Sequence, residues 1–170
     1  MSDDQIILRP VTVDDLGFTR AVRNDPEVNT LALGRRFPIT EVGEQRWFEG
    51  LGQGAFPSEA TFIVAAEQSD EPRGLVSIHG IDWINRTAWF GIWIAPEHQG
   101  HGIGTRATEL AIAYAKDRIE LRRLKLQVLA DHAVAVGIYT AAGFREEGRL
   151  VGEVLIAGTA HDVLLLAHPL

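Results

Sequence analysis

The chain has 170 residues, which suits one domain spanning residues 1–170 with a core of its own. Its charge of 16 − 23 = −7 disfavours nucleic-acid partners, and no apolar stretch approaches the roughly 20 residues of a membrane helix. The absence of cysteine excludes disulfides, thiolate zinc sites and cysteine nucleophiles. Because residues 1–4 lack the basic start of a signal peptide, we expect a cytoplasmic protein without a membrane partner.

The first third of the chain is predicted to form one strand and two helices. Residues 6–8 are a short apolar run typical of a strand. Thr12 with Asp15 three residues later resembles a capping box, and the helix that it begins should end at residues 24–26, Asn-Asp-Pro. A second helix is predicted over residues 40–50, before a glycine-rich loop.

The rest of the chain alternates between strand and helix patterns. Three β-rich runs, 61–67, 74–81 and 87–94, indicate an antiparallel meander. They are followed by a helix over 103–117, a strand over 124–129, a helix around 135–142 and strands around 144–156 and 161–167. This order predicts an α/β (α+β) fold with a central twisted mixed sheet flanked by helices, antiparallel at first and parallel across the helix 103–117.

A loop with three glycines in five residues precedes the helix 103–117. Residues 99–105 read Gln-Gly-His-Gly-Ile-Gly-Thr, and the first turn of a helix leaves its N–H groups unpaired. Such a junction suits a pyrophosphate, although a merely connecting loop is an equal alternative. A dinucleotide fingerprint is disfavoured because Thr105 takes the place of its third glycine, and a P-loop because no lysine precedes Lys116.

Two spaced motifs resemble those of the GNAT superfamily of N-acetyltransferases. Gln99-x-x-Gly102-x-Gly104 is similar to its Q/R-x-x-G-x-G/A signature for acetyl-coenzyme A (acetyl-CoA). The segment 135–144, with Ala135, Ile138, Tyr139, Gly143 and Phe144, is similar to its A-x-x-L-Y-x-x-x-G-F segment. Residues 7–10, 81–86 and 158–162 resemble the ribosomal-protein alanine and spermidine acetyltransferase branch. The likeness therefore covers nearly the whole chain.

The resemblance implies a GNAT-type acyl-CoA N-acyltransferase fold and acetyl-CoA as cosubstrate, with no metal. The cofactor-binding residues that it implies, through pyrophosphate and pantetheine contacts, are Trp93, Ile94, Ala95, Gln99, Gly100, His101, Gly102, Ile103, Gly104, Thr105 and His132. Tyr139 aligns with the tyrosine that protonates the departing thiolate in many members. Its apolar neighbours would equally suit a core residue.

The chain departs from the family at two places. Many relatives carry asparagine where this chain has His132, so that cofactor contact stays open. The branch often has an acidic residue after the alanine at position 88, where this chain has Trp89. The general base is therefore open; His79 is a candidate for it, or an ordinary exposed or satisfied histidine. Trp83 and Trp89 are candidates for the substrate pocket, with the core or a dimer surface as alternatives.

The predicted reaction is direct acetyl transfer, in a ternary complex, to a primary amine. The acceptor is a peptide or protein α-amine or a small amine such as a polyamine. A non-catalytic acyl-CoA-binding or sensing domain is the rival hypothesis, and a structural glycine loop is a weaker one. His98 and His101 lack a third ligand at metal spacing. The apolar run within residues 151–166 predicts a homodimer through a terminal strand, or else an ordinary buried strand.

Overall fold

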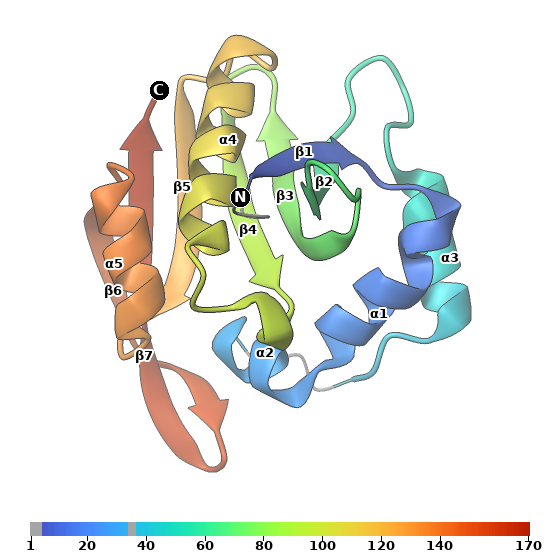
Figure 1. Cartoon of the computed structure of the whole chain (residues 1–170). Coiled ribbons are helices and arrows are strands. Elements are labelled where there is room, and N and C mark those ends of the chain that lie inside the picture. Colours follow the sequence, from blue (N-terminus) through green and yellow to red (C-terminus); the bar gives the residue numbers. More distant parts are fainter. Residues whose placement is uncertain (1–4, 34–36) are drawn as a thin grey trace.

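The computed structural model describes residues 5–33 and 37–170. Seven strands form one twisted mixed sheet in the order β1-β2-β3-β4-β5-β7-β6 (Figure 1). The strands are β1 (Ile6–Pro10), β2 (Glu59–Ala66), β3 (Pro72–Asp82), β4 (Thr87–Ile94), β5 (Arg123–Leu129), β6 (Arg145–Ile156) and β7 (Thr159–Pro169). The helices are α1 (Leu16–Asn24), α2 (Pro26–Leu31), α3 (Glu41–Gly50), α4 (Ile103–Asp117) and α5 (Ala133–Ala141), with short 3₁₀ turns at Val13–Asp15 and Pro96–His98.

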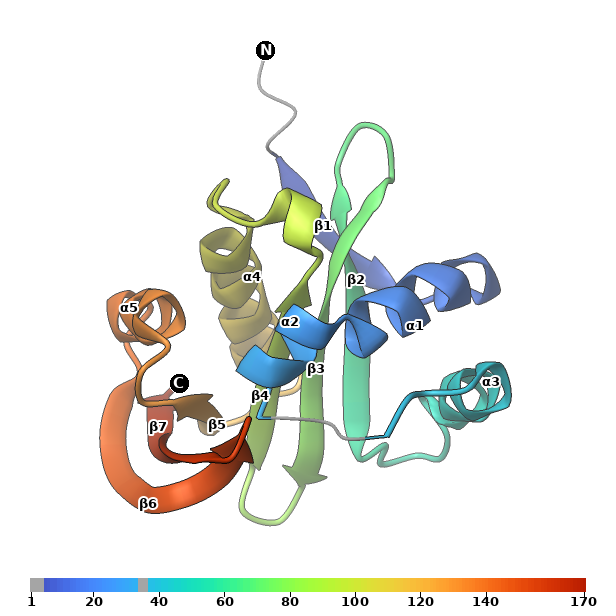
Figure 2. The ribbon, with the colours of Figure 1, turned by 90° about the horizontal axis from the view of Figure 1, so that it is seen from below.

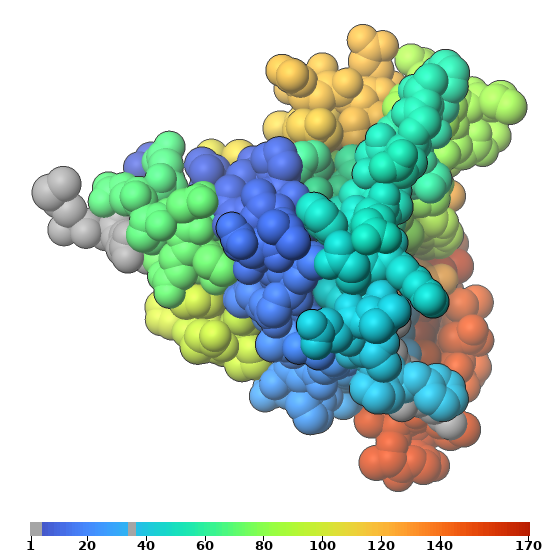
Figure 3. All heavy atoms as spheres, turned by 90° about the vertical axis from the view of Figure 1, so that its right-hand side faces the viewer, coloured from blue at the N-terminus to red at the C-terminus, as the bar shows by residue number. Residues whose placement is uncertain are grey.

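Helices cover both faces of the sheet. Side chains of α4 pack in the large core cluster with alternate residues of β2, β3 and β4, such as Val64, Val76 and Phe90. The residues between them point to the opposite face, where Leu75 packs near Trp47 of α3. Figure 2 shows α4 and α5 on one side of β3 and β4, and α1 and α3 on the other. In Figure 3 the blue to cyan segments, which include α1 and α3, form much of the visible surface.

The sheet changes direction between β4 and β5, as the sequence predicted. These strands are parallel and pair only between residues 87–89 and 123–125. Beyond Trp89 they part, and the remainder of β4 has β3 as its neighbour on one side only. The divergence opens the edge of β4 toward α4 and α5, and it fixes where a ligand can enter between the two halves of the sheet.

The N-terminal capping signals are confirmed, but one helix was missed. Asp15 Oδ2 accepts hydrogen bonds from the backbone N–H of Thr12 at 2.8 Å and from its hydroxyl at 2.9 Å. Helix α1 ends at Asn24 as expected. The chain then forms α2, because the Asp25 carboxylate accepts from two N–H groups of its first turn and Pro26 occupies the first helical position. The sequence predicted only a helix end at Asp25-Pro26, although the same pair also begins a helix.

A buried ion pair joins α1 to α3. The Glu44 side chain is 2% exposed and pairs with Arg23, whose guanidinium lies 4.1 Å above the Trp47 ring. The Thr19 hydroxyl donates to the same carboxylate at 2.5 Å. A buried carboxylate needs such partners, because its desolvation would otherwise be very costly. The contacts hold α1, and the helix α2 that follows it, over the sheet.

The C-terminal strand is not an edge strand, which corrects the reasoning for a dimer through it. Strand β7 lies between β5 and β6, so the run 163–166 is covered within the chain. Val163 is 1% exposed and Leu166 is 4% exposed. The outer edge belongs to β6, on which Val151 is 82% exposed. Within residues 5–33 and 37–170, no helix is both long and apolar enough to cross a bilayer.

Candidate active site

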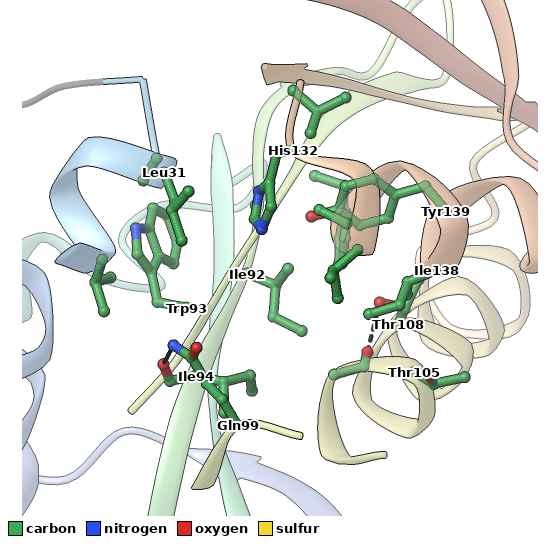
Figure 4. A pocket seen from close by; sticks show the side chains of 18 of the residues that line it. Leu31, Ile92, Trp93, Ile94, Gln99, Thr105, Thr108, His132, Ile138 and Tyr139 are labelled. Atoms are coloured by element: carbon green, nitrogen blue, oxygen red, sulfur yellow. Dashed lines mark hydrogen bonds between the residues drawn. The ribbon is translucent and has the colours of Figure 1, made fainter. Parts of the chain in front are cut away.

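A pocket of about 990 Å³ lies where β4 and β5 part (Figure 4). Its walls come from α2, the inner strands, the glycine loop, α4 and α5. This size is in the range of sites for small molecules and cofactors. Because α4 and α5 lie on one face and α2 on the other, the pocket passes through the sheet at the divergence. We call its two ends the loop end, beside the glycine loop, and the helix end, beside α2.

At the loop end, the glycine loop turns directly into α4. Gly100 and Gly102 both have φ of +78°, a left-handed conformation that side chains disfavour, and Gly102 caps the helix. The Gln99 side chain donates to the carbonyl of Ile94 at 3.0 Å, so it ties the loop to the end of β4. The first turn of α4 then presents its backbone N–H groups at the pocket. An anion bound there would meet these donors and the positive end of the helix dipole.

The predicted loop residues divide into those at the pocket and those away from it. Gln99, Gly100, Gly102, Gly104 and Thr105 line it. His101 is exposed and Ile103 is 3% exposed in the core, and neither side chain is among the lining residues. Ile103 is the first residue of α4, and its side chain points about 100° away from that of the next residue, Gly104.

The free edge of β4 offers backbone groups of alternate residues. The N–H of Ala95 donates to the carbonyl of Arg73 at 3.0 Å, so Ala95 is paired with β3 and does not line the pocket. Backbone polar groups alternate sides along a strand, which turns those of Ile94 and Ile92 toward the opening. Of the three residues predicted to pair with pantetheine, Ile94 therefore has the suitable backbone orientation, and Trp93 lines the pocket with its side chain.

Tyr139 lies on α5 at the centre of the pocket. Its ring contacts Phe90 at 6.2 Å and Phe144 at 5.9 Å between centroids, edge to face in both cases. Its hydroxyl points into the cavity, in the direction of His132 (Figure 4). Burial raises the pKa of Tyr139 to about 12, so the phenol keeps its proton at neutral pH. The ring thus packs against the core while the hydroxyl faces the pocket, so the catalytic role of Tyr139 stays a prediction.

Two histidines line the pocket. His132 precedes α5 and lies between Leu31 and Tyr139, away from Gln99 and Thr105 (Figure 4). Burial lowers the pKa of His132, although Asp131 opposes this shift. His79 on β3 belongs to the other face, and its Nδ1 lies 3.3 Å from the hydroxyl of Ser77. Burial lowers the pKa of His79, and the negative charge of Glu59 partly offsets that shift. His79 is therefore mainly neutral at pH 7 and can accept a proton.

The tryptophans differ in their relation to the pocket. Trp89 and Trp93 share a face of β4, and both line it. The ammonium of Lys125 lies 4.5 Å over the Trp89 ring. Trp83 is elsewhere: its Nε1–H donates to the Pro57 carbonyl at 3.0 Å, and it is not among the lining residues. Trp83, in the turn between β3 and β4, is thus separated from Trp89, the other tryptophan predicted for the substrate pocket.

Several site residues were missed by the sequence reading. The helix end is formed in part by Glu27 and Leu31 of α2, the helix that was not predicted. Thr108 lies one turn along α4 from Gly104 and donates to its carbonyl at 2.8 Å. The capping signal of Asp25-Pro26 predicts the helix that carries Glu27 and Leu31. The helical period places Thr108 on the same face of α4 as Gly104. Within the described residues no cluster of three His, Cys, Asp or Glu side chains is placed to hold a metal ion.

Comparisons with known proteins agree with this geometry. The family model of the acetyltransferase (GNAT) domain matches residues 5–145. The chain is 41% identical over 163 residues to the spermidine N(1)-acetyltransferase of Escherichia coli (strain K12), covering 96% of this chain and 85% of that protein. The corresponding enzyme of Vibrio cholerae serotype O1 is 31% identical over 161 residues, covering 95% and 91%. A crystal structure of spermidine N-acetyltransferase from Vibrio cholerae in complex with CoA and spermine has a TM-score of 0.89 at 29% identity, covering 97% and 95%.

Proposed function

The chain belongs to the acetyltransferase (GNAT) family and transfers the acetyl group of acetyl-CoA to a primary amine; we propose which residues perform each step and which amines it accepts. The observation that carries the proposal is the pocket, which brings together the start of α4, the phenol of Tyr139 and the imidazole of His79 where β4 and β5 part. Proximity of the two substrates in that opening supplies much of the rate.

The loop end holds acetyl-CoA. The backbone N–H groups of the loop 99–105 bind its pyrophosphate, and Gly102 keeps the approach free of a side chain. The backbone of Ile94 and Ile92 pairs with the pantetheine amides at the open edge of β4, in the manner of an added strand. Acetyl-CoA supplies a thioester whose carbonyl carbon is open to attack by an amine.

Tyr139 is the general acid for the departing sulfur. Its pKa of about 12 means that it enters the reaction protonated. An ordinary thiol has a pKa near 8.5, but the same apolar surroundings also disfavour a thiolate, which makes the leaving sulfur a stronger base there than in water. Proton transfer from Tyr139 to that sulfur therefore accompanies cleavage of the carbon–sulfur bond.

His79 is the general base for the acceptor. It stands on the strand opposite Trp89, its partner in the register, on the face that α2 covers. Trp89 stands where the branch often carries an acidic residue, and His79 is the titratable residue paired with it across the two strands. A neutral imidazole at this place takes one proton from the incoming ammonium group, which leaves a nucleophilic amine.

A polyamine is the first acceptor that we propose. The relatives reported above act on spermidine, Glu27 at the helix end carries a carboxylate for an ammonium group, and Trp93 offers an aromatic face to another. The net charge of −7 also favours the approach of a polycation.

An amine with an apolar body is the second candidate. Glu27 is the one carboxylate among the pocket residues that the structure describes. Much of the helix end is apolar, with Leu31, Leu33 and Trp89. Such walls suit a hydrocarbon chain or a ring better than a series of charges.

Mass spectrometry of a mixed acceptor panel tests these proposals. Protein and acetyl-CoA are incubated with spermidine, phenethylamine and a peptide with a free N-terminus, and a +42 Da product is sought for each. We expect acetylated spermidine, and acetylated phenethylamine if the apolar walls dominate. Binding of CoA by calorimetry without any acetylated amine would instead support a non-catalytic acyl-CoA-binding domain.

We also propose that the chain self-associates through the outer edge of β6. This strand has one neighbour, β7, and exposes Val151 and Leu155, which are 82% and 56% exposed. Unpaired edges with apolar side chains favour strand pairing between copies. Sedimentation equilibrium should give about 37 kDa, twice the 18.7 kDa chain. A single-chain mass at every concentration would exclude the dimer.

A further inference from the structure

A row of polar side chains crosses β2 and β3 on the face opposite α4. Glu59 is the register partner of His79, and Thr61 is the partner of Ser77. Alternation along each strand places all four on one face. The next pair along the same face, Ile63 and Leu75, is apolar. Only His79 among the four has a part in the proposed function.

The hydrogen bonds of this row have a definite direction. The Glu59 carboxylate can only accept, and its Oε1 accepts from the hydroxyl of Thr61 and, at 3.3 Å, from that of Ser77. The Ser77 hydroxyl has one proton, and it donates that proton in its hydrogen bond to Glu59. At its contact of 3.3 Å with His79 Nδ1, the Ser77 oxygen must therefore accept. This arrangement requires the His79 tautomer with the proton on Nδ1, which leaves the lone pair on Nε2.

The imidazole is accessible from the side where an acceptor would lie. Gly91 is the register partner of Ser77, and a Cβ built on it would lie 3.8 Å from His79 Cε1 and 3.0 Å from the Trp93 ring. The Trp93 ring therefore occupies the space over Gly91 beside the imidazole, where a larger residue would crowd it. Both rings line the main pocket. A primary amine can therefore approach the His79 ring from that pocket.

The other end of the row meets a second cavity. Glu59 and Thr61 line this space of about 820 Å³, which is bounded also by Phe48 and Leu51. The Glu59 side chain therefore borders this second cavity, while its Oε1 faces Ser77. Its negative charge favours a positive charge on the imidazole.

We propose that Glu59 and Ser77 are positioning residues, which hold His79 in the Nδ1–H tautomer so that Nε2 takes the proton of the acceptor. The inference rests on the proposed function, in which His79 is the base. In the step, an N–H bond of the ammonium group breaks and a bond from that proton to Nε2 forms. The resulting imidazolium donates through Nδ1–H to Ser77, and Glu59 balances its charge. Nε2 later returns the proton to water. The logic is that of a catalytic triad, with a hydroxyl inserted between carboxylate and imidazole.

The charges near His79 come from three other elements. Glu59 of β2 favours the imidazolium, Glu27 of α2 lines the same pocket, and Lys125 of β5 stands over the adjoining Trp89 ring. Replacement of Glu59 by glutamine removes the favourable charge but keeps an acceptor for Ser77. The pKa of His79 should then fall further, and the acid limb of the rate profile should move to lower pH.

Nitrogen-15 NMR of the histidine side chains tests the tautomer without any acceptor. His79→Gln assigns the resonance in the labelled full-length protein. We expect the unprotonated shift on Nε2 of His79 in the parent chain and in Thr61→Val, which keeps the Ser77 contact, and a tautomer mixture in Ser77→Ala. A parent His79 with its proton on Nε2 would overturn the inference.

Kinetics with the acceptor found by the panel provide the second measurement. Turnover should fall about tenfold in Ser77→Ala and in Glu59→Gln, and less than twofold in Thr61→Val, with CoA affinity unchanged in all three. The acid limb of kcat/KM should shift downward in Glu59→Gln. Suppose that His79→Gln is impaired, but Ser77→Ala keeps the parent tautomer and Glu59→Gln keeps the parent acid limb of kcat/KM. This inference then fails, while the proposed base stands. If His79→Gln keeps full turnover, the proposed base fails and this inference fails with it.

Discussion

The two ends of the pocket are built in different ways. At the loop end, one short segment, residues 99–105, supplies the groups that we propose bind CoA, and most of them are backbone N–H groups at a helix start. At the helix end, the side chains come from α2, β3 and β4, which are brought together by strand register and helix packing. Backbone groups at a helix start tolerate changes of sequence that preserve the turn, whereas an assembly of side chains does not. The loop end should therefore be robust and general, and the helix end should be where substrate preference is set.

The largest expected effect comes from breaking the packing that supports the helix end. Glu44→Ala leaves Arg23 with a buried and unpaired charge, and removal of one partner of a buried pair typically costs about 3–5 kcal/mol. Urea unfolding should show this loss. In the fraction that stays folded, KM for the acceptor should rise while calorimetry gives unchanged CoA affinity.

Two control variants sharpen that experiment. Glu41→Ala removes an exposed carboxylate from the same helix and should change stability by less than about 0.5 kcal/mol. Glu44→Gln keeps an acceptor for Thr19 and should fall between the two. Equal losses of CoA and acceptor affinity would mean that the two ends are not independent.

Tyr139 stands between the ends, and its removal should affect chemistry alone. Tyr139→Phe keeps the ring contacts with Phe90 and Phe144 and deletes the acid, so kcat should fall about 100-fold or more with little change in CoA affinity. Tyr114→Phe is the matched control, because that ring packs on Phe62 away from the pocket. Normal turnover in Tyr139→Phe would leave Tyr139 with a packing role only.

The loop end is tested by a side chain at Gly102. Gly102→Val should weaken CoA binding about tenfold or more, because φ of +78° is strained for valine and its branches would obstruct the pyrophosphate. Gly54→Val carries comparable strain at φ of +83°, with open space around it and no place in the pocket. It should cost similar stability and leave CoA affinity intact. Equal affinities in the two variants would contradict the proposed clamp.

The same contrast explains what the sequence could predict. Helix α4 and strand β4 have the predicted bounds, since their periodicity is long and regular. The loop end was found because its residues are adjacent in sequence and carry a local signature. Ser77 and Glu59 were not found, because 18 positions separate them and only the β2–β3 register brings them together. The short helix α2 was missed, and with it Glu27 and Leu31.

The smallest expected effect concerns the charge of the helix end. Glu27→Gln removes the carboxylate from the pocket without changing its shape, and exposed ion pairs contribute about 0.2–1 kcal/mol. KM for spermidine should therefore rise about threefold, more at low salt than at high salt, and KM for phenethylamine should not change with salt. Glu41→Gln, on a helix outside the pocket, controls for net charge. A parallel change in both acceptors would mean that Glu27 supports α2 through its N-terminal position rather than by binding a second ammonium group. A change confined to spermidine would place the preference for polycations on this single side chain, with the apolar walls around it left to accept simpler amines.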